Sequence, residues 1–179
     1  MDLNNYTELK IVERGGYYLT PMLEHHIDEF LKVISPENQY EILLMGHEDV
    51  RSALVEMVEN AEVYVFKDIN NKIIAAGGLF YGEDAECPQM FAMFSKGIRN
   101  NFKLLARASR MIVNFFDRTL PSMSMSVLSD YESMAQWAVW LGFEPVGITE
   151  HNENKYIEFV RCNPSKKNVY NSISRPVMH

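Results

Sequence analysis

The chain has 179 residues, of which 47% are hydrophobic, 12% aromatic and 23% charged, and this composition is typical of a globular protein rather than a disordered or fibrous one. A chain of this length buries enough apolar surface to fold as one domain without disulfide bonds or a structural metal. With 17 basic and 24 acidic residues its net charge is −7, which argues against a protein that coats nucleic acid over its whole surface.

Several other classes of protein are excluded by the same inspection. No segment approaches the roughly 18 uncharged apolar residues of a membrane-spanning helix, and the first ten residues lack the pattern of a signal peptide. The two cysteines, Cys87 and Cys162, cannot form a zinc site by themselves and are expected to be reduced thiols. We therefore expect a protein of the cell interior with no metal site.

The first half of the chain predicts one strand, two helices and a hairpin. An alternating pattern indicates the strand, apolar residues at helical spacing indicate the helices, and a turn between two apolar runs indicates the hairpin. Thr20 and Pro21 look like the start of the first helix, and Pro36 follows its end. The predicted ranges are Glu8–Glu13 for the strand, Thr20–Ile34 and Glu48–Asn60 for the helices, and Glu62–Lys67 and Lys72–Tyr81 for the hairpin.

The second half predicts four strands and two helices. Pro121 ends a long helix, a strand of near-perfect alternation (SMSMSVL) follows it, and Gly142 closes a short helix. The predicted ranges are the strand Gln89–Phe94, the helix Gly97–Arg118, the strand Ser122–Leu128, the helix Tyr131–Trp140, and the strands Glu144–Thr149 and Lys155–Arg161.

These elements predict a mixed α/β sheet in the order β-α-α-β-β-β-α-β-α-β-β. A strand that follows a long crossover helix is most simply parallel to the strand before it, so we expect the sheet to splay at one parallel junction. Residues 1–162 form the predicted single domain. Residues 163–179 contain Lys166, Lys167 and Arg175 but no acid, and we expect them to form a basic C-terminal extension.

This order, above all over Gln89–Phe143, resembles the GNAT fold of acyl-CoA-dependent N-acyltransferases. The segment WAVWLGFEPVG (Trp137–Gly147) is similar to the GNAT segment in which a helix ends in Leu-Gly-Phe. Together with NFKLLARASRMIV upstream, it resembles GNAT-like proteins of short-tailed bacteriophages that are often labelled internal virion or virion-assembly proteins. The resemblance covers about residues 8–161, and it implies a place in the host cytoplasm or in a virion.

The resemblance implies an acetyl-CoA site at the start of the long helix, where a helix N-terminus and a glycine-rich loop of the type Arg/Gln-x-x-Gly-x-Gly/Ala bind the pyrophosphate. Only one glycine of that pattern is present here, so the loop is degenerate, although Lys96 and Arg99 could neutralise phosphate with their side chains. The matching residues, and hence the candidates for cofactor binding, are Lys96, Gly97, Ile98, Arg99, Asn100 and Asn101.

The resemblance also implies a general acid, often a tyrosine four residues before the glycine of Leu-Gly-Phe. That position is Ala138, which cannot transfer a proton. Tyr131, one to two turns upstream, is a weak substitute. Glu83, with Asp84 and Glu86 close by, is a weak candidate for the base. The sequence therefore assigns no catalytic residue beyond these two weak candidates.

The long helix carries a basic stripe with no acid between Ser95 and Asn114. Its residues recur at steps of three or four, so they lie along one face of the helix. Two tryptophans three residues apart also share a face of the short helix, either as core packing or as a binding surface. The candidates for partner binding are Lys103, Arg107, Arg110, Trp137 and Trp140.

Three functions remain open at this stage. The chain is a non-catalytic virion or assembly component on a GNAT scaffold, an active acetyl-CoA-dependent N-acetyltransferase with an atypical loop, or a module that binds nucleic acid or an acidic partner through the basic stripe. Whether it is an enzyme stays undecided, because fold alone does not choose among functions. The cofactor is none, or acetyl-CoA if the chain is active.

Overall fold

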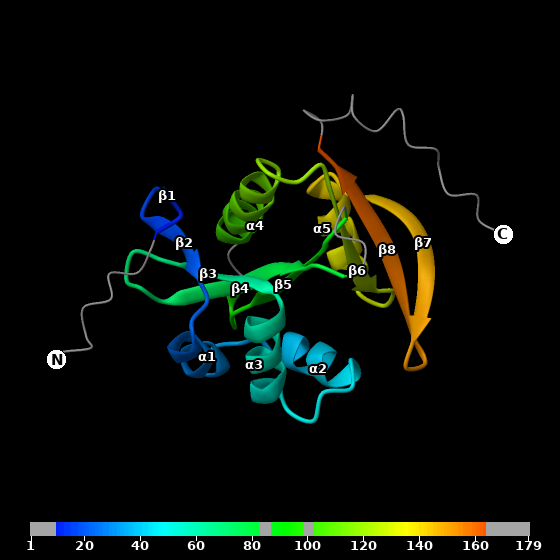
Figure 1. The fold of residues 1–179 in the computed structure, drawn as a ribbon, viewed down its shortest axis with the longest axis horizontal. Helices are drawn as coiled ribbons and strands as arrows, with labels where there is room; N and C mark the ends of the chain where they lie inside the picture. Colours follow the sequence, from blue (N-terminus) through cyan, green and yellow to red (C-terminus); the bar gives the residue numbers. More distant parts are fainter. Residues whose placement is uncertain (1–9, 83–86, 99–101, 164–179) are drawn as a thin grey trace.

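A computed structural model describes residues 10–82, 87–98 and 102–163 of the chain. These residues form an eight-stranded mixed sheet with the strand order β1-β2-β3-β4-β5-β6-β8-β7, together with five helices (Figure 1). The mixed α/β class predicted from the sequence is confirmed, and the predicted order of elements is confirmed from α3 onward. Two additional elements, one strand and one helix, occur near the N-terminus.

The additional strand belongs to a hairpin that the sequence analysis did not recognise. Strands β1 (Val12–Arg14) and β2 (Tyr17–Pro21) pair antiparallel around Gly15 and Gly16, whose φ angles are +61° and +81°. Thr20 and Pro21, which we expected at a helix start, therefore end β2. Helix α1 begins later, at Glu24, and runs to Leu31 (Glu24–Leu31).

The additional helix, α2 (Pro36–Leu44), begins at the proline that we expected to follow a helix end. Ser35 caps α2, because the Asn38 N–H donates to Ser35 Oγ at 3.2 Å, and Pro36 occupies the first helical position, where its missing N–H costs nothing. Helix α3 (Val50–Asn60) agrees with the predicted second helix, and Asp49 caps it.

The rest of the chain follows the prediction closely. Strands β3, β4 and β5 form an antiparallel meander, and α4 then crosses to β6; α5 leads to the final hairpin of β7 and β8. Their bounds are β3 (Glu62–Lys67), β4 (Ile73–Phe80), β5 (Gln89–Phe94), α4 (Phe102–Phe116), β6 (Ser122–Leu128), α5 (Glu132–Trp140), β7 (Glu144–His151) and β8 (Asn154–Cys162).

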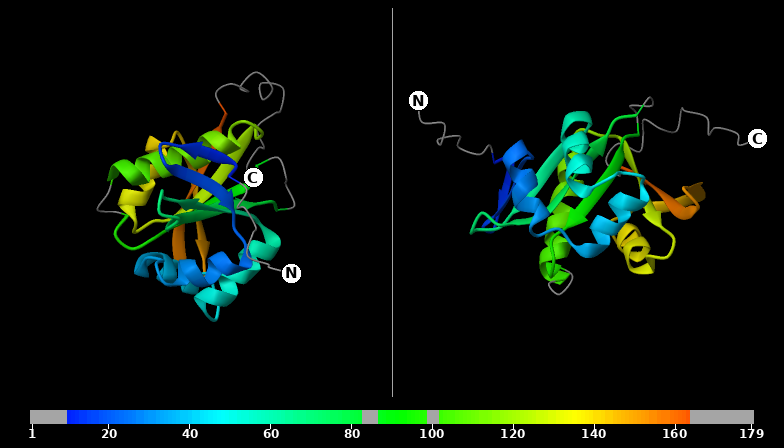
Figure 2. Two further views of the ribbon diagram at one scale, coloured as in Figure 1. Left: turned by 90° about the vertical axis from the view of Figure 1, so that its left-hand side faces the viewer. Right: turned by 90° about the horizontal axis from the view of Figure 1, so that it is seen from below.

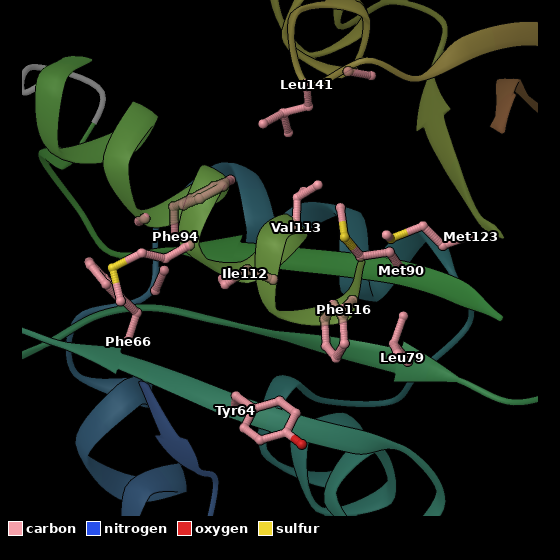
Figure 3. Close-up of a cluster of buried hydrophobic side chains, with 14 of the residues drawn as sticks. Tyr64, Phe66, Leu79, Met90, Phe94, Ile112, Val113, Phe116, Met123 and Leu141 are labelled. Atoms are coloured by element: carbon pink, nitrogen blue, oxygen red, sulfur yellow. The ribbon is translucent and has the colours of Figure 1, made fainter. Parts of the chain in front are cut away.

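The helices cover the sheet on both faces. Helices α4 and α5 lie on one face and α1, α2 and α3 on the other (Figures 1 and 2). The larger hydrophobic cluster lies under α4 and α5, and Phe116, Phe94, Phe66 and Met123 project into it (Figure 3). A second cluster, which includes Phe30, packs α1 and α3 against β3, β4 and β5.

The sheet splays between β5 and β6, as predicted. These two parallel strands share a single residue pair, Gln89 with Ser124, at the first residue of β5. Beyond this pair the strands diverge toward their C-terminal ends, and β6 continues its pairing with β8 instead. Among the described residues the outer strand β7 pairs only with β8, and all eight of its residues are exposed.

Arg161 on β8 connects this strand by hydrogen bonds to the ends of α4 and α5. Its guanidinium donates to both carboxylate oxygens of Asp117, just after α4, at 3.2 and 2.6 Å. It also donates to the Leu141 carbonyl at the end of α5, at 2.8 Å. The next residue, Gly142, has a φ angle of +87° and ends α5 as predicted.

Asn163 is the last residue that the structure describes. It is buried, its N–H donates to the Pro121 carbonyl at 2.9 Å, and its side chain contacts the Asp117 and Leu120 carbonyls. The domain boundary after residue 162 stays a prediction, since the proposed extension lies outside the described residues. None of the described helices is long and apolar enough to cross a membrane.

Candidate functional site

The resemblance to the GNAT fold implies that an acyl-CoA would lie in the gap between β5 and β6, which share one residue pair. Ser95 directly follows β5, and its N–H donates to the carbonyl of Ile74 on the neighbouring strand β4 at 2.9 Å. Because main-chain groups alternate in direction along an extended strand, those of Phe94 and Lys96 point the other way, toward the gap.

The connector between α1 and α2, residues 33–35, occupies this edge of β5. The Ser35 N–H donates to the Phe94 carbonyl at 2.9 Å, and the Lys96 N–H donates to the Val33 carbonyl at 2.6 Å. Ile34 and Ser95 form an antiparallel bridge between the two bonds. Between the Gln89–Ser124 pair and the connector, only Met90 and Ala92 of β5 direct their main-chain groups toward the gap.

Asn38 completes this attachment from the first turn of α2. Its Oδ1 atom accepts the Phe94 N–H at 2.8 Å and the Ser35 hydroxyl at 3.1 Å, and its Nδ2 atom donates to Glu41 at 2.8 Å. Asn38 and Ser35 are both buried. The side chain therefore replaces the partner that β6 would provide if the two strands stayed paired.

Asn38→Ala is expected to lower the free energy of unfolding by about 2 kcal/mol, because the buried Phe94 N–H loses its acceptor. Equilibrium unfolding in urea measures this change. The neighbouring substitution Gln39→Ala removes only a 3.3 Å bond of a half-buried side chain to the Ile34 carbonyl, and it serves as the control with a smaller loss. Equal losses in the two variants would contradict the assigned role of Asn38.

Two clefts flank the segment that follows β5. The larger, of about 730 Å³, lies between the end of α1, the turn from β3 to β4 and this segment, and its charged lining residues are Glu29, Lys32, Asp68, Lys72 and Lys96. The smaller, of about 390 Å³, lies between the same segment and the start of α2. Both clefts are lined by Ser95, Lys96, Gly97 and Ile98.

The predicted cofactor-binding residues are only partly described. Lys96, Gly97 and Ile98 line both clefts, and Gly97 has a φ angle of +80° with no atom within 4 Å of the position of a Cβ. Ile98 is 4% exposed and packs in the larger core cluster, so its bulk is largely taken up by the core rather than crowding the clefts. Arg99, Asn100 and Asn101 lie outside the described residues.

Of the two weak catalytic candidates, the structure describes only Tyr131. Tyr131 directly precedes α5 and packs against the core cluster under α4 and α5. Ala138, at the position where the resemblance implies the acid, is 1% exposed within the same cluster. Glu83 and its acidic neighbours lie outside the described residues.

A row of polar side chains crosses four strands on the opposite face, where the sequence analysis identified no site. Gln89 donates to Ser126 at 2.9 Å, and the hydroxyls of Ser126 and Thr149 each donate to Glu158 at 2.6 Å. Near this row on β8, burial and the charge of Glu41 raise the pKa of Tyr156. The only sequence signal was the serine on alternate positions of SMSMSVL, which places Ser124 and Ser126 on one face.

The predicted partner-binding residues do lie together. Lys103, Arg107 and Arg110 are exposed on α4, and the guanidinium of Arg110 lies 4.2 Å from the centre of the Trp140 ring. Trp137 and Trp140 stack at 4.7 Å, and Trp137 Nε1 donates to Ser109 Oγ on α4 at 3.2 Å. The two indoles thus join α5 to the basic face of α4.

Groups suited to metal binding or to thiol chemistry do not cluster in the described part of the chain. It contains no group of three His, Cys, Asp or Glu side chains arranged for a metal ion, and Cys87 and Cys162 are free thiols. His26 is fully buried, accepts the Leu23 N–H at Nδ1, and has its Nε2 atom 3.1 Å from Lys67 Nζ.

Comparisons with known proteins bear on the fold. No family model and no curated protein matches the sequence. A GNAT-family protein from Chromobacterium violaceum, described as a probable acetyltransferase, matches with a TM-score of 0.68 and 15% identity over 87% of this chain and 92% of that one. A ribosomal-protein-S5-alanine acetyltransferase from Vibrio fischeri matches with a TM-score of 0.61 and 15% identity over 86% and 96%.

The N152L mutant of the spermidine N-acetyltransferase SpeG from Vibrio cholerae matches with a TM-score of 0.61 and 11% identity over 87% of this chain and 99% of that one. At such low identity these similarities establish the GNAT acetyltransferase fold and leave activity, substrate and partner open. They do not bear on the resemblance to the phage family.

Proposed function

We propose that this chain is a GNAT-fold protein that does not transfer acetyl groups and acts through contacts with other proteins. The observation that carries the proposal is the attachment of residues 33–35 and Asn38 to the gap-facing edge of β5. The connector thereby occupies main-chain groups of Phe94 and Lys96 on the edge of β5 that faces the gap. The described residues therefore do not fit the cofactor as they stand.

Two features of the residues add support. The loop before α4 contains one glycine where the resemblance implies two, so the pattern that lets a diphosphate approach the main chain closely is incomplete. Ala138 replaces the expected acid and is buried, so no group at that position can protonate a leaving thiolate. Cofactor binding at the loop before α4 and proton transfer at position 138 are therefore each impaired, by different residues.

The phage context remains part of the proposal. It is supported by the similarity of NFKLLARASRMIV and WAVWLGFE to the phage family, and it assigns the chain to a virion or to its assembly. Sedimentation with purified particles from infected cells would test this assignment. A chain that is absent from the particles and from their assembly intermediates would contradict it.

Acetyl transfer is the second candidate, and the polar row favours it. The single Gln89–Ser124 pair marks the base of the gap. From Gln89 on β5, hydrogen bonds lead through Ser126 on β6 to the Glu158 carboxylate on β8. A carboxylate there could accept a proton from an amine. An active enzyme would need the connector to leave β5 before the cofactor binds.

The test is thermal unfolding of the full chain with and without 1 mM acetyl-CoA, together with a thiol assay for released CoA. A ligand at 100 times its Kd would add about 2.7 kcal/mol to the free energy of unfolding, which is readily seen as a higher Tm. We expect no change in Tm and no release of CoA with amine or peptide acceptors. A clear rise in Tm or sustained turnover would refute the proposal.

Asn38→Ala sharpens this test. A rise in Tm with acetyl-CoA in this variant alone would identify the connector as the element that excludes the cofactor. The absence of a rise in both proteins would mean that the loop before α4 is sufficient to prevent binding.

A further inference from the structure

The outer face of α4 carries three cations without acidic partners. Lys103, Arg107 and Arg110 are exposed, and among residues 10–82, 87–98 and 102–163 no carboxylate oxygen lies within 4.0 Å of their charged nitrogens. In a chain with a net charge of −7, such a stripe is an unusual concentration of positive charge.

Arg107 rests on one end of a stack of aromatic rings. Its guanidinium carbon lies 5.5 Å from the centre of the Tyr17 ring, and Tyr17 stacks on Phe66 at 5.7 Å with an interplanar angle of 9°. Phe66 is fully buried. The stack therefore anchors the exposed guanidinium to the core through β2 and β3.

Arg110, one turn further along α4, repeats the arrangement on the other flank. Its guanidinium lies 4.2 Å from the Trp140 ring, which stacks on Trp137 at an angle of 23°. Trp140 therefore contacts both Trp137 and Arg110 and is still 40% exposed. Figure 1 shows α4 between β2 on one side and α5 on the other.

A guanidinium that rests on an aromatic ring is held in position, while the N–H groups at its edge stay available. Such a group binds a carboxylate through two parallel hydrogen bonds, and little side-chain entropy is lost on binding because the side chain is already ordered. Two of these groups at i and i+3, with Lys103 one turn before them, span about 10 Å of helix. This length accommodates a short stretch of an acidic polypeptide.

We propose that the α4 surface, formed by Lys103, Arg107, Arg110 and Trp140, binds an acidic segment of a partner protein. The inference rests on the proposed function, because it names the class of partner for a chain that works through protein contacts. Trp140 within this surface is 40% exposed, and Val139, which precedes it in α5, is 55% exposed. The segment is therefore expected to carry apolar residues among its acidic ones.

Nucleic acid is the less favoured ligand for the same surface. Proteins that bind it commonly contact about 6 to 10 phosphates, and the described surface offers three cations. Single strands also need open ring faces on which bases stack, whereas the Tyr17 and Trp140 rings each already stack on another ring and contact a guanidinium. The charge of −7 adds repulsion along a long polyanion.

The test measures fluorescence anisotropy of a labelled 12-residue peptide of glutamates with two leucines, titrated with the full chain at 50 mM salt. The same peptide with glutamines, and a 20-residue oligothymidine, are the comparison probes. We expect binding of the glutamate peptide only. Arg107→Glu/Arg110→Glu is expected to weaken it at least tenfold, and Arg107→Lys/Arg110→Lys severalfold, because lysine lacks the planar pair of donors.

The matched control is Lys72→Glu/Lys155→Glu, which makes the same change in charge at exposed residues on other elements and is expected to change the Kd less than twofold. Circular dichroism confirms that each variant is folded. The inference is overturned by equal binding of the glutamine peptide, by tighter binding of oligothymidine, or by an unchanged Kd in Arg107→Glu/Arg110→Glu. It is also overturned if that variant dissociates an oligomer in sedimentation, since the occupant would then be a second copy.

The thiol assay on the same variants separates the two proposals. CoA release combined with arginine-dependent peptide binding would refute the proposed function and leave the α4 surface in place. Absence of both would refute the surface alone.

Discussion

Arg161→Met is expected to lower the free energy of unfolding by about 4 kcal/mol. The Arg161 and Asp117 side chains are only 13% and 17% exposed, so the substitution leaves a carboxylate largely away from water without its cation. It also removes the donor to the Leu141 carbonyl at the end of α5. Equilibrium unfolding in urea, followed by circular dichroism, measures the loss.

Two further variants check the cause. Arg161→Met/Asp117→Leu removes both charges and is expected to be more stable than Arg161→Met, because no uncompensated charge remains. Arg51→Met breaks an ion pair to Asp28 whose side chains are 52% and 63% exposed, and it should change stability by less than about 1 kcal/mol. A loss in Arg161→Met no greater than that in Arg51→Met would contradict our interpretation.

Gly78→Ala is expected to cost about 3 kcal/mol, because a methyl group at this position collides with the main chain of β3. A Cβ there would overlap the Glu62 carbonyl oxygen and lie 3.0 Å from the Cα of Val63, the residue with which Gly78 pairs. Main chain cannot rotate away as a flexible side chain does, so the pairing of β3 and β4 must shift. Urea unfolding again measures the effect.

Gly147→Ala is the control for this substitution. Gly147 also lies in a strand, but no atom comes within 4 Å of the position of its Cβ. The alanine variant should therefore be as stable as the parent chain within about 0.5 kcal/mol, or slightly more stable because its unfolded state is less flexible. Similar losses in Gly78→Ala and Gly147→Ala would show that steric contact with β3 is not the cause.

Local patterns predicted most of the fold because they report which face of each element is buried. The alternation in SMSMSVL, the helical spacing over α4 and the glycine at position 142 each reflect contacts within a few residues. Local patterns misled where one signal has two meanings. Pro36 fits the end of one helix and the start of another, and Ser35 decides the matter by capping α2.

The candidate site was less accessible to the same reasoning. The connector meets β5 across about sixty residues of sequence, and the polar row draws on four separate strands. No spacing in the chain encodes such meetings; they follow from the tertiary arrangement of the sheet. The basic stripe of α4 was visible in the sequence because one helix supplies all of it, while the rings beneath Arg107 and Arg110 required the structure.

The position of β7 at the rim has a consequence for assembly. An outer strand with Val146 56% and Ile148 70% exposed could recruit another strand and extend the sheet into a fibre. Pro145 lacks a main-chain donor, and the pairing with β8 shifts register between Pro145 and Gly147. Two copies meeting antiparallel about Gly147 would also oppose Glu144 to Glu150. These features disfavour lateral growth of the sheet by self-addition.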